Sequence, residues 1–197
     1  RAALGGAGRA KIRDDVVCTA KLSVALGFGR IEVQMARGYL LRQFLSPISS
    51  QRADDYGGGL ENRMRVPLEV FDAGQAAVRE DIPVWVRVSG TDWVPGGWDI
   101  EDTVALGLAL KGRGCAAIHV SSGGVSPKQQ IPLSDGYQVH LAAQVKKEVG
   151  LPTIAVGLIT EPAHAEEILT NGEADAIALA RGMLFNPRWP WHAAAEL

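Results

Sequence analysis

The chain has 197 residues, a net charge of −2 at neutral pH and 47% hydrophobic residues, so it can bury one sizeable core. Its pI near 6.1 argues against nucleic acid and anionic membranes as partners, because both attract strongly basic surfaces. No apolar run approaches the roughly 18 residues that are needed to cross a bilayer.

The two cysteines, Cys18 and Cys115, lie far apart and fit no metal-ligand spacing. This favours a reducing compartment, the cytoplasm, and each cysteine is expected to be a small buried apolar residue. Residues 1–11 are basic and rich in Ala and Gly, but they are short and lack a convincing targeting pattern. We therefore expect one domain over residues 1–197, with residues 1–11 as a loose N-terminal segment.

Predicted strands and helices alternate along the chain. Short apolar runs typical of buried strands occur at residues 30–33, 84–89, 116–120, 153–156 and 176–180. Helical spacing predicts helices at residues 12–26, 63–79, 100–112 and 137–149. We expect a further helix with Thr160 as its N-cap, and a short one after residues 186–192. The alternation indicates parallel β/α units. A barrel and an open doubly wound sheet both fit, although no Gly-rich dinucleotide fingerprint follows the first strand.

A long polar connection follows the first predicted strand and leads to the helix near Arg65. Excursions of this size at a strand end are usually functional. In a barrel, the carboxyl ends of all strands open onto one mouth, where the chemistry is done. Polar residues or glycines occupy these ends in the sequence: Gln34, Arg37, Tyr39, Arg87, residues 121–124, Gly157 and Arg181.

Two arginines and one histidine have alternative interpretations. Arg87 interrupts an apolar strand, so its guanidinium needs either a carboxylate, which is the commoner outcome, or an electron-rich ligand. Arg181 follows the last strand, where barrels commonly hold a phosphate, but a surface salt bridge fits its position equally well. His119 lies on a strand and is expected to be a hydrogen-bonded core residue rather than a catalyst.

Six blocks of the chain, in order, resemble one protein family. They are GYLLRQFLSPISSQRADDYGGGLENRMR, PVWVRVSGTDW, AAIHVSSGGVSP, GYQV, TIAVGLIT and ADAIALARGMLFNP. Together they are similar to the old yellow enzyme family of FMN-dependent NAD(P)H oxidoreductases, in particular to bacterial-type xenobiotic and enone reductases. The resemblance extends from about Gly27 to the C-terminus.

This resemblance implies an α/β fold of the (β/α)8 TIM-barrel type, incomplete, with about strands 4 to 8 and their helices. It implies FMN as the cofactor, NADPH or NADH as the reductant and a small electrophilic alkene as the substrate. It implies neither a nucleic acid nor a membrane partner, and it is compatible with a homo-oligomer. No residue is assigned to a metal.

The resemblance also assigns residue roles. Tyr39 resembles a substrate-pocket tyrosine that in some members protonates the α-carbon of the alkene. Gln34 and Arg37 fall where the family places a His/His or His/Asn pair, which binds the substrate carbonyl oxygen and stabilises enolate charge. The cofactor-binding candidates include an arginine at the flavin N1/O2 edge and a phosphate site, and they are Arg87, Ser122, Gly123, Gly157, Ala180 and Arg181.

Three departures from the family pattern leave an alternative open. Gln34 and Arg37 replace the usual pair, and Ala180 precedes Arg181 where glycine is usual. The matching region begins with the helix before the fourth barrel strand, so we expect the first and fifth strands to be unpaired edges. The alternative is therefore a truncated, non-catalytic remnant that no longer holds flavin alone. A phosphate-binding barrel lyase or isomerase also fits the strand ends but explains none of the six blocks.

Overall fold

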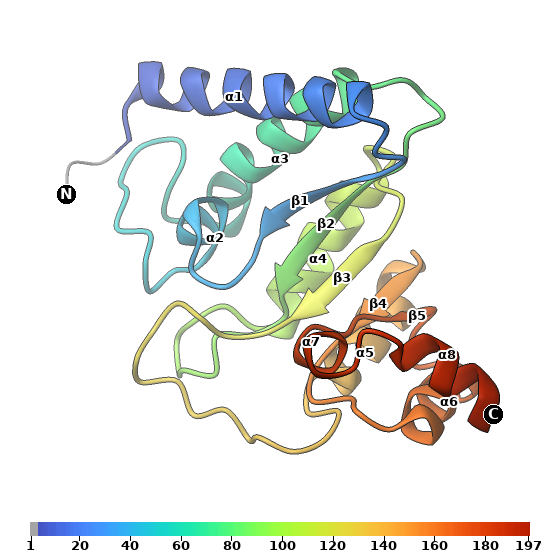
Figure 1. Ribbon diagram of the computed structural model, residues 1–197. Helices are drawn as coiled ribbons and strands as arrows, with labels where there is room; N and C mark the ends of the chain where they lie inside the picture. Colours follow the sequence, from blue (N-terminus) through green and yellow to red (C-terminus); the bar gives the residue numbers. More distant parts are fainter. Residues whose placement is uncertain (1–3) are drawn as a thin grey trace.

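Five parallel strands form one sheet in the order in which they occur in the chain (Figure 1). The structure is a computed structural model that describes residues 4–197. The strands are β1 (Ile31–Met35), β2 (Val84–Ser89), β3 (Ile118–Ser121), β4 (Thr153–Ala155) and β5 (Ala176–Ile177). The helices are α1 (Gly6–Ala25), α2 (Leu40–Leu45), α3 (Leu60–Ala76), α4 (Ile100–Lys111), α5 (Val139–Val149), α6 (Pro162–Thr170), α7 (Arg181–Phe185) and α8 (Trp189–Glu196).

The sequential strand order distinguishes the two architectures that the sequence left open. A doubly wound sheet reverses its strand order at a switch point, whereas a barrel adds each new strand beside the previous one. All four pairings in this sheet are parallel and follow the chain. The fold is thus part of a (β/α)8-type barrel, and β1 and β5 are its outer strands within residues 4–197, as predicted.

Strand residues alternate between a helix-covered face and an opposite face. Val33 and Val86 are buried and belong to the hydrophobic core, which also includes side chains from α2 to α6. The opposite face carries a row of register partners, in which Gln34 lies beside Arg87 and Arg87 beside His119. The sequence had predicted that the second strand is covered on both faces, but Arg87 and its neighbour Trp85 are only half-buried. This polar row lies on the face of the sheet opposite the helix-covered core, and two of its members, Gln34 and Arg87, line a cavity.

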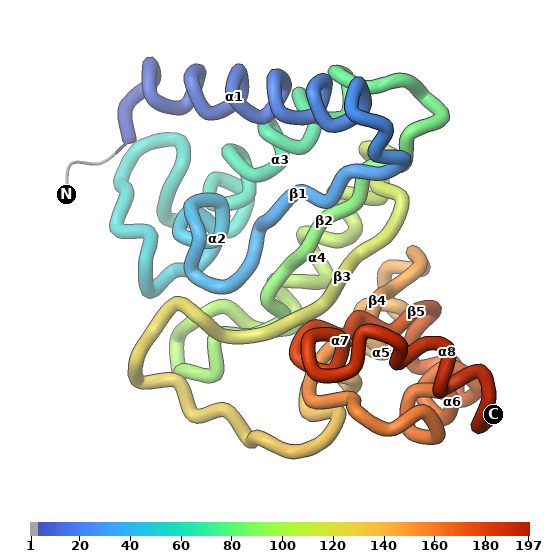
Figure 2. Tube along the Cα trace, viewed as in Figure 1, coloured from blue at the N-terminus to red at the C-terminus, as the bar shows by residue number. Residues whose placement is uncertain are grey.

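The N-terminal helix is longer than predicted. It begins at Gly6 instead of residue 12, so residues 6–11 are helical and not a loose segment; residues 1–3 lie outside the described part. The Arg9 guanidinium lies 3.8 Å from the centroid of the Tyr56 ring, and the Arg52 Nη1 atom donates to the Leu4 carbonyl. These contacts fix the first turn of α1 against the connection between α2 and α3, beside which it runs in the Cα trace (Figure 2).

Other differences involve short elements and helix ends. The helices α2 and α7 were not predicted because runs of six and five residues are too short to show a helical period. The helix α6 has Glu161 rather than Thr160 at its N-cap. Cys115 is buried as expected, but Cys18 is exposed on α1, so its prediction as a buried residue is wrong. Within residues 4–197, no helix has the length and apolar composition that a transmembrane span requires.

Candidate active site

A cavity of about 640 Å³ lies at the carboxyl ends of the strands. It is bounded by one residue each of β1 and β2, by residues that follow β1, β4 and β5, and by two residues that precede α5. Its lining consists of Gln34, Arg37, Tyr39, Arg87, Tyr137, Gln138, residues 156–160 and residues 178–182. The segments that contribute are far apart in the sequence, and the parallel sheet brings their ends together at one mouth.

Seven of the nine predicted site residues line this cavity: Gln34, Arg37, Tyr39, Arg87, Gly157, Ala180 and Arg181. Ser122 and Gly123 do not. Ser122 is 3% exposed and its hydroxyl donates to the Gln138 side chain. The Gly123 N–H donates to the Thr91 carbonyl, and the Gly123 carbonyl accepts from Ser89. The Ser122 hydroxyl and both backbone polar groups of Gly123 are thus engaged in holding neighbouring loops.

The cavity is strongly cationic, although the whole chain carries a net charge of −2. Three arginines line it, Arg37, Arg87 and Arg181, and no aspartate or glutamate is among its lining residues. Like charges gathered in one cavity repel one another unless an anion joins them. This composition indicates an anionic ligand.

Arg87 has no acidic partner in the part of the chain that the structure describes. Its Nε atom is buried without a hydrogen-bond partner, and no carboxylate oxygen of residues 4–197 lies within 4 Å of its guanidinium. Burial lowers the pKa of Arg87, the negative charge of Glu32 opposes this effect, and the positive charge of Arg37 adds to it. A buried guanidinium N–H without an acceptor is costly. The sequence left a structural ion pair open as the commoner outcome for Arg87, and the described residues do not form one.

The exit of β1 presents Gln34, Arg37 and Tyr39 to the cavity. Arg37 adopts a left-handed backbone conformation with φ 58°, which is uncommon for residues other than glycine. Tyr39 is 62% exposed and occupies the N-cap position of α2. The Gln34 Oε1 atom accepts from the Ala36 N–H at 3.1 Å, which leaves the Gln34 amide N–H groups for a ligand.

The exits of β4 and β5 form the opposite wall. Gly157 has φ 134° and Leu158 has φ 52°, so the chain turns sharply after β4. The buried Gln138 donates to the Val156 carbonyl at 2.9 Å and supports this turn. Arg181 is exposed, begins α7 and forms no ion pair with another described residue. Tyr137 and Gln138 also line the cavity; neither was predicted as a site residue, although both lie in the GYQV block.

His119 sits beside Arg87 on the same face of the sheet. Its Nδ1 atom lies 2.9 Å from Glu32 Oε2, which also accepts from Trp85 Nε1 at 3.0 Å. Burial raises the pKa of Glu32, but the hydrogen bonds and charges of His119, Trp85 and Arg87 outweigh burial and lower it overall. His119 is buried and does not line the cavity. The prediction of a hydrogen-bonded histidine therefore holds for the Nδ1 atom, whereas the Nε2 atom is buried without a partner among the described residues.

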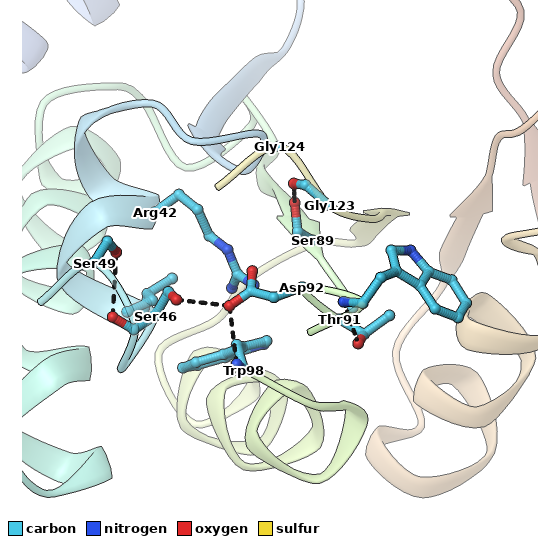
Figure 3. A network of polar contacts seen from close by, with 12 residues as sticks. Arg42, Ser46, Ser49, Ser89, Thr91, Asp92, Trp98, Gly123 and Gly124 are labelled. Carbon is cyan, nitrogen blue, oxygen red and sulfur yellow. Dashed lines mark hydrogen bonds and ion pairs between the residues drawn. The ribbon is translucent and has the colours of Figure 1, made fainter. Parts of the chain in front are cut away.

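Behind the cavity, a buried polar network holds α2 in place (Figure 3). Arg42 and Asp92 form an ion pair at 2.5 Å, and both side chains have 0% exposure. The same carboxylate accepts from the Ser46 hydroxyl at 2.6 Å and from the Trp98 N–H at 2.9 Å. The network ties α2, which starts directly after Tyr39, to the loop that follows β2.

The sequence profile of the NADH:flavin oxidoreductase / NADH oxidase family matches residues 10–197. The chain belongs to this family. The expected resemblance to flavin oxidoreductases is therefore confirmed over nearly the whole chain, together with the partial-barrel fold.

Members of the flavin oxidoreductase family with similar sequences carry dehydrogenase and oxidase names. An NADPH dehydrogenase of Geobacillus thermodenitrificans is 47% identical over 173 residues, which cover 87% of this chain and 49% of the relative. An NADH oxidase of Thermoanaerobacter brockii is 40% identical and is matched over 26% of its length. Morphinone reductase, solved in complex with tetrahydroNAD, is 28% identical with a TM-score of 0.77 over 98% of this chain and 51% of that one. The chain thus spans about half the length of the curated NADPH dehydrogenases that it matches.

Proposed function

We propose that the cavity binds FMN and that the chain takes part in hydride transfer from NADPH or NADH to a small electrophilic alkene. The observation that carries the proposal is the set of three arginines in a cavity whose lining has no carboxylate. FMN offers two anionic groups to such a site, a phosphate at one end and the reduced ring at the other. Membership in the flavin oxidoreductase family makes a flavin the expected occupant.

The residues present fit this cofactor. The buried Nε atom of Arg87 has no partner, and a flavin ring edge with acceptor atoms would supply one. Arg181, with the backbone at Ala180 and Gly157, would hold the phosphate through a planar guanidinium and N–H donors. When bound, the flavin supplies the hydride chemistry, while the protein supplies orientation and electrostatic stabilisation.

The β1 exit would handle the substrate. The Arg37 guanidinium and the Gln34 amide are donors that can bind a carbonyl oxygen and stabilise the negative charge that develops on it. Tyr39, whose ring lies at the cavity, would donate its phenolic proton to the α-carbon of the alkene. Arg37 and Gln34 differ in length from imidazole, so the substrate carbonyl must sit at a different distance from β1 than it would beside a histidine pair.

Similar proteins support the nicotinamide part of the proposal. The similar bacterial proteins are named NADPH dehydrogenase and NADH oxidase, and morphinone reductase was solved with tetrahydroNAD. We include the cytoplasm in the proposal because both cysteines are free and a reducing compartment keeps them so. Assembly with a second copy belongs to the proposal as well, because β1 and β5 are outer strands of the described sheet.

Titration of the purified chain with FMN tests the proposal. Binding at the cavity should quench flavin fluorescence with one flavin per chain, and NADPH or NADH should then bleach the visible absorption band. Addition of 2-cyclohexenone should restore the band, since the alkene reoxidises the flavin. A chain that stays colourless at saturating FMN contradicts the proposal and supports the non-catalytic remnant.

A further inference from the structure

The hydroxyl of Ser89, the last residue of β2, joins the exits of the two strands that flank β2, namely β1 and β3. Its Oγ atom accepts from the Arg37 N–H at 3.0 Å and donates to the Gly123 carbonyl at 3.0 Å. The side chain has 0% exposure and does not line the cavity. We propose that Ser89 is a positioning residue that sets the β1 exit loop, and through it Arg37 and Tyr39; its catalytic consequence rests on the proposed function.

Arg37 needs an external partner to keep its conformation. At φ 58° it lies in the left-handed region, where a side chain crowds the following carbonyl. The Arg37 N–H donates to the Ser89 hydroxyl, and this hydrogen bond stabilises the left-handed conformation of Arg37. Strained residues of this kind persist only where their surroundings fix them, and they occur preferentially at functional sites. Arg37 meets both conditions, because it also lines the cavity.

Two glycines let the loops after β1 and β3 approach each other closely enough for the Ser89 hydroxyl to bond to both. A Cβ atom on Gly38 would overlap the carbonyl of Gly124, and one on Gly124 would lie 2.6 Å from the Arg37 Cα. Both glycines have positive φ angles. The backbones of the β1 and β3 exits therefore touch, and the Ser89 hydroxyl lies between Arg37 and Gly123. Figure 3 shows the bond from Ser89 to Gly123 with Gly124 beside it.

The two hydrogen bonds of the Ser89 hydroxyl fix the backbone that carries the Arg37 and Tyr39 side chains. Gly38 and Tyr39 follow Arg37 directly, and α2 starts at Leu40. The buried network around Arg42 fixes α2 from one side, while Ser89 fixes the loop at its other end. With both ends held, the backbone from which the Arg37 and Tyr39 side chains extend has little freedom. Without the hydroxyl, the loop would be free to leave the left-handed conformation.

Ser121 provides a matched control in the next strand. It is the register partner of Ser89 on β3 and has the same 0% exposure. Its hydroxyl donates to the Val88 carbonyl at 2.9 Å and does not contact the β1 exit. Loss of either hydroxyl removes hydrogen bonding from a buried serine, so a merely structural role predicts the same response from both variants.

Amide hydrogen exchange of the ligand-free full chain tests the bridge. In Ser89→Ala, exchange across residues 36–40 should be about five- to tenfold faster than in the wild type, as expected for the loss of one hydrogen bond. Ser121→Ala should leave this segment unchanged, and Ser89→Thr, which keeps the hydroxyl, should restore slow exchange. Ser89→Cys, similar in size but a weaker hydrogen-bonding group, serves if the alanine variant does not fold. Equal exchange in the Ser89 and Ser121 variants would overturn the proposal.

A second measurement links the bridge to catalysis and separates the two proposals. In the FMN-loaded chain, Ser89→Ala should slow flavin reoxidation by 2-cyclohexenone about tenfold, while reduction by NADPH keeps its rate. Reoxidation at the wild-type rate, despite faster exchange at residues 36–40, would overturn the catalytic role of Ser89. If the wild type binds no FMN, the proposed function fails, and the exchange measurement still decides whether Ser89 holds the loop.

Discussion

Arg42 and Arg87 both have guanidinium groups that are removed from solvent at least in part, but the surroundings of the two groups differ. Arg42 has 0% exposure and is paired with Asp92 at 2.5 Å, and it stacks 4.9 Å from the centroid of the Trp98 ring. Arg87 is half-buried, has no carboxylate partner in the described chain, and faces the cavity. Both guanidiniums keep buried N–H groups without an acceptor, Nε and Nη1 in Arg42 and Nε in Arg87. The difference is the counter-charge: Arg42 has a carboxylate inside the fold, whereas Arg87 has none among the described residues.

The contrast separates stability from ligand binding. A buried charge with a partner stabilises the fold only as long as the partner is present, and its loss leaves an uncompensated charge. A half-buried charge without a partner stabilises nothing in the ligand-free protein and is available to an anion. Mutation of the buried pair and mutation of Arg87 should therefore have opposite effects on stability. Four experiments test this difference and the roles of the neighbouring charged residues.

The largest effect is expected at the buried pair. Asp92→Ala leaves the Arg42 guanidinium buried without its counter-charge, and we expect the free energy of unfolding to fall by about 3–5 kcal/mol. Urea denaturation measures this change. Asp81→Ala is the control, because Asp81 pairs with Arg79 on the exposed surface and should change stability little. If the two aspartate variants are equally stable, the buried network does not hold the fold.

The opposite response is expected at Arg87. Arg87→Met should weaken FMN binding by about 10- to 100-fold, the size expected for a hydrogen bond to a charged group. It should leave the unfolding free energy unchanged or slightly raised, because the variant removes a half-buried charge that has no partner. Flavin titration and urea denaturation measure the two quantities, and the exposed Arg79→Met is the control. A stability loss like that of Asp92→Ala would make Arg87 a structural residue.

A smaller and more selective effect is expected at Arg181. If its guanidinium holds the phosphate, Arg181→Ala should weaken FMN binding about tenfold and leave riboflavin, which lacks the phosphate, unaffected. Titration of the same variant with both flavins measures this. An equal loss for both ligands would place Arg181 at the ring rather than at the phosphate.

The smallest effect concerns Glu32, whose pKa lies below its usual value: burial raises it, but His119, Trp85 and Arg87 lower it more. A lowered pKa in the folded state adds stability above the unfolded-state pKa, and this contribution is lost as the pH falls through the folded-state value. The unfolding free energy should therefore decline between about pH 5 and pH 3, and less steeply in Glu32→Gln. Glu80→Gln, at an exposed position, is the control. If the unfolding free energy falls equally with pH in the wild type and in Glu32→Gln, Glu32 does not contribute to the loss of stability in acid.

The alternation of strands and helices predicted a parallel α/β fold, and the resemblance to flavin oxidoreductases indicated a partial barrel. In a barrel the ends of parallel strands meet at one mouth, so Gln34, Arg87, Gly157 and Arg181 could be grouped once that fold was assumed. Helix ends were less accurate: residues 6–11 contain two glycines, which disfavour a helix, and the contact between Arg9 and Tyr56 that fixes them is tertiary.

The supporting interactions could not be predicted in this way. Ser89 and Arg37 are 52 residues apart in the sequence, and Arg42 and Asp92 are 50 residues apart. A serine at the end of an apolar strand, or an arginine in a short helix, does not reveal its partner. The Ser122 hydroxyl likewise donates to the Gln138 side chain, a contact that no local pattern indicates. The sequence therefore names the groups at the mouth, and only the three-dimensional structure shows what holds them.

The proposed function requires Arg87 and Arg181 to bind opposite ends of one ligand. A crystal structure of the chain soaked with FMN would show whether they do. We expect the isoalloxazine N1/O2 edge against the Arg87 guanidinium and the phosphate against Arg181, with the alkene side of the ring open toward Tyr39. Flavin density elsewhere on the molecule, or density that touches only one of the two arginines, would contradict it.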